Sequence, residues 1–197
     1  NYFFRMSKYQ ERLIAYINDN PDFVQPKGKR SEVLGFLNKP LGDLCISRPK
    51  SRLEWGVELP FDDDFVTYVW FDALLNYTTA LGYKQADKSQ EQFNKFWPDA
   101  LHLIGKDILT THAVYWPTML MALEVPLPKC IFAHGWWLTA DDKKMSKSEG
   151  PVVAPLDMKN IVGVDGLRYF LMRGMNSAQD GQFSKELVLT RVNSELA

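Results

Sequence analysis

The sequence predicts an α/β fold, consisting of half of a doubly wound parallel sheet followed by a helical segment. Three short apolar runs, at residues 66–70, 101–104 and 130–133, are typical of strands and alternate with helical patterns. This alternation indicates a parallel sheet with right-handed crossover connections. Beyond Gly150 the pattern becomes mostly helical. Because three strands make only half of a doubly wound sheet, we expect the other half to lie upstream.

Two helices are expected before the sheet. Residues 2–18 carry apolar side chains at helical spacing, and Pro21 follows the end of that run. Ser31 is a suitable N-cap for a second helix. The basic residues 27–30 between these helices are expected to form a solvated turn, with RNA contact as the less favoured alternative. Residues 40–52 are polar and irregular, which suggests a domain boundary there.

The later helices follow from the same spacing rules. We expect a helix from about Asp72, after the first strand, and a long helix over residues 108–123, after the second. Residues 167–173 form an amphipathic helical pattern, and Ser184 begins a last helix. A mostly polar loop over residues 177–183 separates these two.

Composition excludes several classes of protein. The 197 residues carry a formal net charge of −1, so any RNA contact must come from local patches. Two cysteines cannot build a four-cysteine zinc site or a disulfide framework. Cys45 and Cys130 lie in apolar runs, which predicts buried thiols in a reducing compartment. No apolar run is long enough to cross a membrane.

We expect a cytoplasmic protein with no membrane partner, or one in an organellar matrix. No signal peptide opens the chain. The chain begins without methionine and enters a helical pattern directly, and it also stops inside one. We therefore expect it to be an internal fragment of a larger protein.

The loop Lys-Met-Ser-Lys-Ser at residues 144–148 is the strongest candidate for chemistry. It follows the strand-like run 130–133, and mobile cations at a strand end suit charge neutralisation on a polyphosphate. Two lysines three positions apart can reach the same polyphosphate. The alternative is a solvated charged loop, since acidic residues flank it on both sides.

A second candidate is the stripe formed by Trp70, Ala73, Leu74 and Tyr77. These positions share one face of a helix that begins at a strand end. Side chains at the carboxyl end of a parallel strand line the ligand crevice of open α/β sheets. Plain core packing is the alternative, because such stripes are usually core.

The third candidate surrounds the end of the second strand. Gly105 would let a ligand approach the backbone, and Asp107 could accept from a ribose hydroxyl or serve as a helix N-cap. Ile108 and His112 share a helix face, which Trp116 extends. A histidine on such a face is more often a satisfied core group. It is not a metal site, because no second ligand sits at a metal-like spacing.

The fourth candidate is His134-Gly135-Trp136-Trp137, at the end of the third strand. Gly135 opens space in which a ring or backbone can meet an adenine. The alternative is a hydrophobic strand end with a turn.

These motifs occur in one order along successive strands. With all of them present, the chain resembles the methionyl-tRNA synthetase family of class I aminoacyl-tRNA synthetases. The matching stretches are residues 1–10, 46–48, 68–73, 105–108, 112, 116–117, 133–136, 144–148 and 165–170. The resemblance covers essentially the whole chain. It implies the end of a connective insertion at 1–50, the second half of a Rossmann-like catalytic domain at 51–140, and the lysine loop with a helical stem-contact region at 141–197.

The resemblance also implies residue roles, substrates and partners. ATP, Mg²⁺, methionine and tRNA(Met) would be used, and Lys144 and Lys147 would stabilise the pyrophosphate leaving group. The positions that match the methionine pocket are Trp70, Ala73, Leu74, Tyr77, Ile108 and His112. The positions that match the ATP site are Gly105, Asp107, His134, Gly135, Trp137, Met145 and Lys147.

The sequence departs from the family pattern in two respects. Glu149-Gly150-Pro151 stands where many relatives have Lys-Gly-Asn, and Thr110-Thr111 replaces a bulkier pair. The upstream His-Ile-Gly-His motif, which supplies the other half of the ATP site, is absent from this sequence. The anticodon-binding domain is also outside it. We therefore expect the chain alone to be inactive. The rival readings are a class I synthetase for an aliphatic amino acid and a non-catalytic nucleotide- or RNA-binding module.

Overall fold

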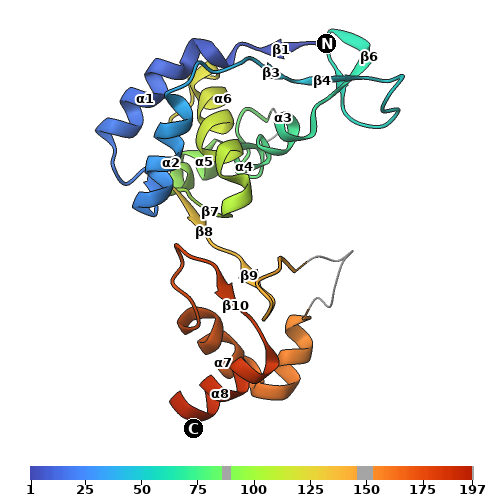
Figure 1. The fold of residues 1–197 in the computed structure, drawn as a ribbon. Helices are drawn as coiled ribbons and strands as arrows, with labels where there is room; N and C mark the ends of the chain where they lie inside the picture. Colours follow the sequence, from blue (N-terminus) through green and yellow to red (C-terminus); the bar gives the residue numbers. More distant parts are fainter. Residues whose placement is uncertain (86–89, 146–152, 197) are drawn as a thin grey trace. The chain divides into compact units, whose positions relative to one another are not determined.

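The computed structural model describes residues 1–85, 90–145 and 153–196. The chain divides into two compact units, Asn1–Ala133 and His134–Ala197 (Figure 1). The first unit contains β1 (Phe3–Phe4), η1 (Met6–Tyr9), α1 (Gln10–Asp19), β2 (Val24–Gln25), α2 (Lys27–Leu37), β3 (Leu44–Cys45), β4 (Ser47–Pro49), β5 (Glu58–Leu59), β6 (Asp62–Thr67), α3 (Val69–Ala73), α4 (Asn76–Thr79), α5 (Glu91–Phe96), η2 (Trp97–Asp99), β7 (Leu101–Gly105), η3 (Lys106–Ile108), η4 (Thr111–Tyr115), α6 (Trp116–Ala122) and β8 (Cys130–His134). The second unit contains β9 (Trp137–Leu138), α7 (Pro155–Arg173), β10 (Gly181–Gln182) and α8 (Lys185–Glu195).

The first unit contains a three-stranded sheet in the order β2-β8-β7. β2 runs parallel to β8, with Val24 opposite Ile131. The Ala100 carbonyl, at the start of β7, accepts from the Lys129 and Cys130 amides, at the start of β8, at 2.9 and 3.4 Å. β7 and β8 therefore begin at the same end of the sheet. The predicted α/β class with a parallel sheet is confirmed.

One of the three predicted strands was assigned to the wrong sheet. The run at 66–70 contributes only its first two residues to β6, and Val69 and Trp70 already belong to α3. β6 pairs antiparallel with β4 and β5 in a separate sheet. The third parallel strand is β2, a two-residue segment too short to give a sequence pattern.

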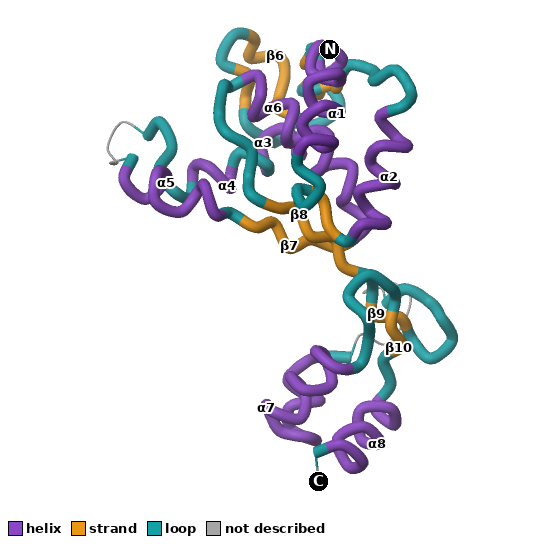
Figure 2. Tube along the Cα trace, turned by 90° about the vertical axis from the view of Figure 1, so that its left-hand side faces the viewer, coloured by secondary structure: helices purple, strands orange, loops and turns teal. Residues whose placement is uncertain are grey.

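Helices α1, α2 and α6 pack together beside this sheet (Figure 2). α1 buries Leu13 and Ile17, and α2 buries Val33 and Leu37, in a core shared with Ile131 of β8. Four-residue spacing within each helix explains why these pairs lie on one face. The core fixes the carboxyl ends of β7 and β8, where the candidate residues lie.

The N-terminal helix begins later than predicted. Phe3–Phe4 forms β1, which pairs antiparallel with Leu44–Cys45 of β3, and regular α-helix starts only at Gln10. The segment 40–52, predicted to be irregular, supplies β3 and β4. Both errors have the same kind of cause, because β1 pairs with β3 about forty positions away and β4 pairs with β6 up to 20 positions away, and such pairings leave no local pattern.

The N-cap prediction for the second helix was wrong. α2 begins at Lys27, directly after Pro26, and Ser31 lies inside it with its hydroxyl donating to the Lys27 carbonyl at 3.3 Å. Residues 27–30 are therefore the first turn of a helix rather than a loop. Proline has no backbone N–H, and the start of a helix does not use one, so Pro26 suits this position.

The two cysteines are free and half-buried, not fully buried as predicted. The Cys45 thiol lies 3.5 Å from the Ser47 carbonyl. Partial burial raises the pKa of the Cys130 thiol, and the nearby Asp22 carboxylate raises it further. Both effects keep the Cys130 thiol protonated at neutral pH.

The long helix predicted over residues 108–123 is built from three helical types. A 3-10 turn (η3) leads into a π-helical segment (η4, Thr111–Tyr115) and then into α6, which ends at Ala122. π-helical turns are rare in proteins, but those that occur are often found at functional sites. This one contains His112.

The second unit combines two helices with a short parallel strand pair. Gly181 of β10 lies opposite Trp137 of β9. α7 is kinked at Gly163, whose φ of 75° is outside the helical region, so the predicted helix at 167–173 is its second half. Ser184 caps α8, as predicted, by accepting from the Leu187 amide at 3.1 Å. The three-part division at residues 50 and 140 is a different division from these compact units, and it stays a prediction.

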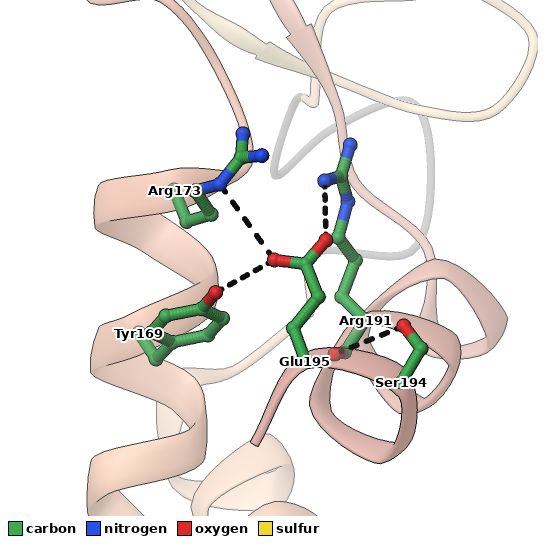
Figure 3. A network of polar contacts seen from close by, with 5 residues as sticks. All are labelled: Tyr169, Arg173, Arg191, Ser194 and Glu195. Atoms are coloured by element: carbon green, nitrogen blue, oxygen red, sulfur yellow. Dashed lines mark hydrogen bonds and ion pairs between the residues drawn. The ribbon is translucent and has the colours of Figure 1, made fainter.

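Figure 3 shows the polar network that joins α7 to α8. The Glu195 carboxylate accepts from the Tyr169 hydroxyl at 2.6 Å and pairs with Arg191 at 2.8 Å and Arg173 at 3.6 Å. The Tyr169 hydrogen bond, followed by the Arg191 hydrogen bond, lowers the pKa of Glu195.

Among the described helices, none is both long enough and apolar enough to cross a membrane.

Candidate functional site

The Trp70–Tyr77 stripe lies on two short consecutive helices, α3 and α4. The backbone stays helical through Leu74 and Leu75, so the predicted common face is preserved. Leu74 is fully buried, Trp70 and Tyr77 are half-buried, and Ala73 is exposed. Leu74 is thus a core residue, while Trp70 and Tyr77 border the core and retain accessible surface.

His112 is held between two oxygen atoms. Its Nδ1 lies 2.9 Å from the Ile108 carbonyl, and its Nε2 lies 2.9 Å from the Tyr77 hydroxyl. Because a carbonyl oxygen only accepts, Nδ1 carries the proton and Nε2 accepts from Tyr77. Burial lowers the pKa of His112, although the Ile108 hydrogen bond opposes this, and the imidazole is neutral at pH 7.

Trp70 completes this group. Its ring meets the His112 ring edge-on, with the centroids 6.1 Å apart at an interplanar angle of 79°. The structure therefore brings together Trp70, Tyr77, Ile108 and His112, which come from α3, α4, η3 and η4. An aromatic wall with one tyrosine hydroxyl and one neutral imidazole suits a largely apolar ligand.

His102 is a buried member of this cluster that sequence reasoning did not single out. Its Nε2 accepts from the Trp116 indole N–H at 3.2 Å, and its ring lies 4.2 Å from the Tyr77 ring centroid. Burial, with a contribution from His112, lowers the pKa of His102 to about 4. The available signal was strand alternation, because His102 and Ile104 share the buried face of β7.

The low pKa of His102 predicts acid sensitivity. Between pH 6.5 and about 4 the unfolded chain binds a proton at this imidazole and the folded chain does not, so acid favours unfolding. The free energy of unfolding should fall by roughly 2–3 kcal/mol from this group between pH 7 and pH 4. Urea unfolding of the wild-type chain and His102→Gln across this range should show the shallower pH dependence in the variant. Equal slopes would contradict the prediction.

Gly105 and Asp107 lie where β7 passes into η3. Gly105 has an ordinary extended backbone (φ −71°, ψ 148°) and precedes η3 as its cap residue. Asp107 is exposed and lies inside η3, so the N-cap alternative for this residue is wrong. Its contact with a ribose hydroxyl stays a prediction.

In the second unit, Gly135 is required by a close approach of the chain to itself. A Cβ atom at this position would lie 2.0 Å from the Gln179 carbonyl oxygen and 2.8 Å from the Asp180 nitrogen. The Gly135 amide also donates to the Ser177 carbonyl at 3.0 Å. The neighbouring His134 is half-buried, with Nδ1 2.7 Å from the Gly135 carbonyl. The structure thus supplies a reason for Gly135 that does not depend on adenine.

Trp137 and Met145 both pack against the small core of the second unit. The Trp137 ring stacks on Phe170, with centroids 5.4 Å apart at 30°. Met145 lines an apolar hollow of about 160 Å³ together with Trp137, Val153 and Phe183. Met145 and Val153 are the described residues that lie on either side of the undescribed segment 146–152, and both are anchored on this core.

Lys144 is the one loop lysine whose position is described. A tight turn, closed by the Thr139 amide donating to the Lys143 carbonyl at 2.9 Å, returns the chain so that Lys144 bridges to Leu138. The exposed Lys144 ammonium lies 4.0 Å from the centroid of the Trp136 ring. Lys147, together with Glu149 and Pro151, lies outside the described residues.

The donor set bears on Mg²⁺. Across residues 1–85, 90–145 and 153–196, no three His, Cys, Asp or Glu side chains are grouped so that they could hold a metal ion. Mg²⁺ commonly binds through substrate phosphates with few protein ligands.

Comparison with known proteins places the chain in a family. All 197 residues match the model described as tRNA synthetases class I (M). The chain is 52% identical to the methionine–tRNA ligase of Clostridium acetobutylicum and 49% identical to that of Rickettsia conorii, covering all of this chain but 30% and 38% of those proteins. A crystal structure of Mycobacterium tuberculosis methionyl-tRNA synthetase bound by methionyl-adenylate aligns with a TM-score of 0.91 and 47% identity, covering 100% of this chain and 38% of that one. The chain thus spans about a third of the length of these relatives. Its match over the whole sequence, supported by its fold, shows that it belongs to the class I (M) family of tRNA synthetases.

Proposed function

We propose that the protein containing this chain is a methionine–tRNA ligase, which activates methionine with ATP and transfers it to tRNA(Met). The observation that carries the proposal is the likeness to the M. tuberculosis enzyme, whose structure was solved with methionyl-adenylate bound. This chain would supply the second half of the catalytic domain and the start of the stem-contact region. We propose a cytoplasmic location for the protein, with an organellar matrix as the alternative.

The proposed reaction requires the side chains to do little more than position the substrates. The methionine carboxylate is already ionised at neutral pH and can attack the α-phosphate in line, with pyrophosphate leaving. A 3′-terminal ribose hydroxyl of tRNA then attacks the adenylate carbonyl, which forms the aminoacyl ester as the anhydride bond breaks and AMP leaves with the hydroxyl proton released. Loop lysines Lys144 and Lys147 would balance charge on the departing phosphates, and Asp107 would hold the ribose. Mg²⁺ would accompany ATP and offset its phosphate charge.

The aromatic cluster supports a thioether as the recognised group. Trp70, Tyr77 and His112 present ring edges and faces, and sulfur makes favourable though modest contacts with aromatic rings. A missing methylene changes binding in an apolar pocket by only about 1–3 kcal/mol. Homocysteine is therefore expected to be a difficult competitor.

The test is amino-acid-dependent ATP–pyrophosphate exchange by a full-length protein that carries this chain, measured with all twenty amino acids. Exchange with methionine alone would support the proposal. Exchange with an aliphatic amino acid would keep the enzyme class and overturn the pocket assignment. No exchange from a folded protein would favour a non-catalytic binding module.

The 197-residue chain alone is expected to give no exchange. Its sequence lacks the His-Ile-Gly-His motif that supplies the rest of the ATP site in the family. The measurement is the same exchange assay on the isolated, folded chain. Detectable methionyl-adenylate formation would contradict this expectation.

Replacing His112 separates the amino-acid pocket from the ATP site. His112→Ala removes the acceptor for the Tyr77 hydroxyl and part of the aromatic wall. The expected result is methionine binding weakened by about 2–3 kcal/mol, with ATP affinity near normal. Isothermal titration of the full-length protein with each substrate measures both. If ATP affinity fell as far as methionine affinity, His112 would be structural.

A further inference from the structure

His102 contacts two aromatic residues, Tyr77 of the candidate pocket and the buried Trp116. It lies on the helix-facing side of β7, where only 5% of its surface is exposed, while its strand neighbours Leu101 and Leu103 are 57% and 66% exposed. Its ring lies close to Tyr77, and its Nε2 accepts from Trp116. A polar side chain on the buried face of a strand needs such partners.

The hydrogen bond to Trp116 constrains both residues. The Trp116 side chain is completely buried and its indole N–H can only donate, so it depends on this acceptor. The other large buried indole, Trp97, donates instead to the Pro126 backbone carbonyl at 2.8 Å. Trp116 therefore relies on a side chain where Trp97 relies on the main chain. A substitution at residue 102 can remove this acceptor without moving the backbone.

The contact with Tyr77 extends the effect to His112. The Tyr77 ring lies with its centroid 4.2 Å from His102 on one side and 6.2 Å from Trp116, and its hydroxyl reaches His112. The direction of the Tyr77 side chain, set by its χ1 rotamer, decides where this hydroxyl lies, and the His102 ring packs against that side chain. His102 thus contacts the residue that donates to His112 and also the residue that packs beside it.

We propose that His102 is a positioning residue of the amino-acid pocket: by accepting from Trp116 and packing on Tyr77, it fixes the ring orientations that let Tyr77 and His112 receive the substrate side chain. The inference rests on the proposed function, since it assumes that this cluster binds the amino acid. It assigns His102 no contact with substrate. The consequence is specific to amino-acid binding and leaves nucleotide binding unaffected.

The test compares amide and apolar replacements in a full-length protein that carries this chain. In His102→Gln the amide oxygen can reach the position of Nε2 and accept from Trp116. His102→Leu keeps a similar volume without an acceptor, and His102→Asn keeps an amide that is one methylene too short. The readouts are the KM for methionine, the KM for ATP and kcat in pyrophosphate exchange, with thermal unfolding as a check on folding.

The expected pattern is a split between the two substrates. His102→Leu and His102→Asn should raise the methionine KM about ten-fold or more, because a buried indole donor loses its partner, with the ATP KM changed by less than about two-fold. His102→Gln should remain within about three-fold of wild type. In a Trp116→Phe background, which has no indole donor to satisfy, His102→Leu should have a much smaller effect on the methionine KM.

Each outcome decides the inference. Equal losses for Gln, Asn and Leu, or a parallel rise in the KM for ATP, would overturn it and leave His102 a packing residue. If His102→Leu does not fold, the Gln and Asn pair decides, because both are amides that differ only in reach. Absence of methionine-dependent exchange in the wild-type protein would overturn the proposed function. Normal wild-type exchange with unaffected variants would overturn the positioning role alone.

Discussion

Gly135→Ala is expected to destabilise the second unit by about 3 kcal/mol or more, because a methyl group at this position has no space. The Cβ atom would lie 2.0 and 2.3 Å from the Gln179 carbonyl oxygen and carbon, which are backbone atoms that cannot rotate away. The β9–β10 pairing runs directly beside this crossing, with the Gly181 amide donating to the Trp136 carbonyl at 2.9 Å. The substitution should break that pairing.

Hydrogen exchange of the backbone amides measures the effect unit by unit. Protection at residues 136–138 and 181–183 should fall sharply in Gly135→Ala, while protection in the first unit stays unchanged. Gly35→Ala is the matched control, since Gly35 lies in α2 with open space at its Cβ position. That change should stabilise the chain by about 0.5–1 kcal/mol, as expected for alanine in place of glycine in a helix. Normal protection in Gly135→Ala would show that the crossing can adjust.

Lys147→Ala is expected to lower the rate of methionine activation by about 10²–10³-fold in the full-length protein, with methionine affinity nearly unchanged. A cation that meets charge developing on the departing pyrophosphate contributes to the transition state more than to the ground state. Single-turnover formation of the adenylate gives the rate, and equilibrium titration with methionine gives the affinity.

Lys143→Ala is the control for Lys147, because it removes the same charge four positions earlier. Its backbone closes the turn to Thr139, and alanine can make the same backbone hydrogen bonds. The expected rate for Lys143→Ala is close to wild type. Equal losses of rate and affinity in Lys147→Ala, or equal rate losses in both variants, would remove the leaving-group role from Lys147.

Local patterns predicted some elements well, and the exceptions share a physical origin. The strands at 101–104 and 130–133 and the Ser184 cap were found because apolar runs and capping side chains act over a few residues. β1 and β2 were missed because their partners lie far away in the chain. The run at 66–70 was assigned to the parallel sheet because strand-forming residues indicate a strand without indicating its partner.

The candidate residues divide in the same way. Helical spacing grouped Tyr77 with Trp70 and, separately, Ile108 with His112, and the structure joins the two groups through the hydrogen bonds of His112. His102 could not be assigned a role, because its partners Trp116 and Tyr77 are 14 and 25 positions away on other elements. The packing roles of Gly135, Trp137 and Met145 could not be predicted either. Each side chain or backbone packs against residues from Phe170 onward, which are more than 20 positions away in the sequence.

The sequence alone determined the class of fold, the family and the order of its motifs, because these depend on local spacing and on the residue types within short motifs. Only the tertiary structure decided which strands pair, that Leu74 is core while Trp70 and Tyr77 keep accessible surface, and that two neutral histidines, His102 and His112, both contact Tyr77. Pairing partners, burial and protonation depend on atoms brought together from distant parts of the chain. A hydrogen-bond acceptor such as His102 acquires its role only when Trp116 is buried against it.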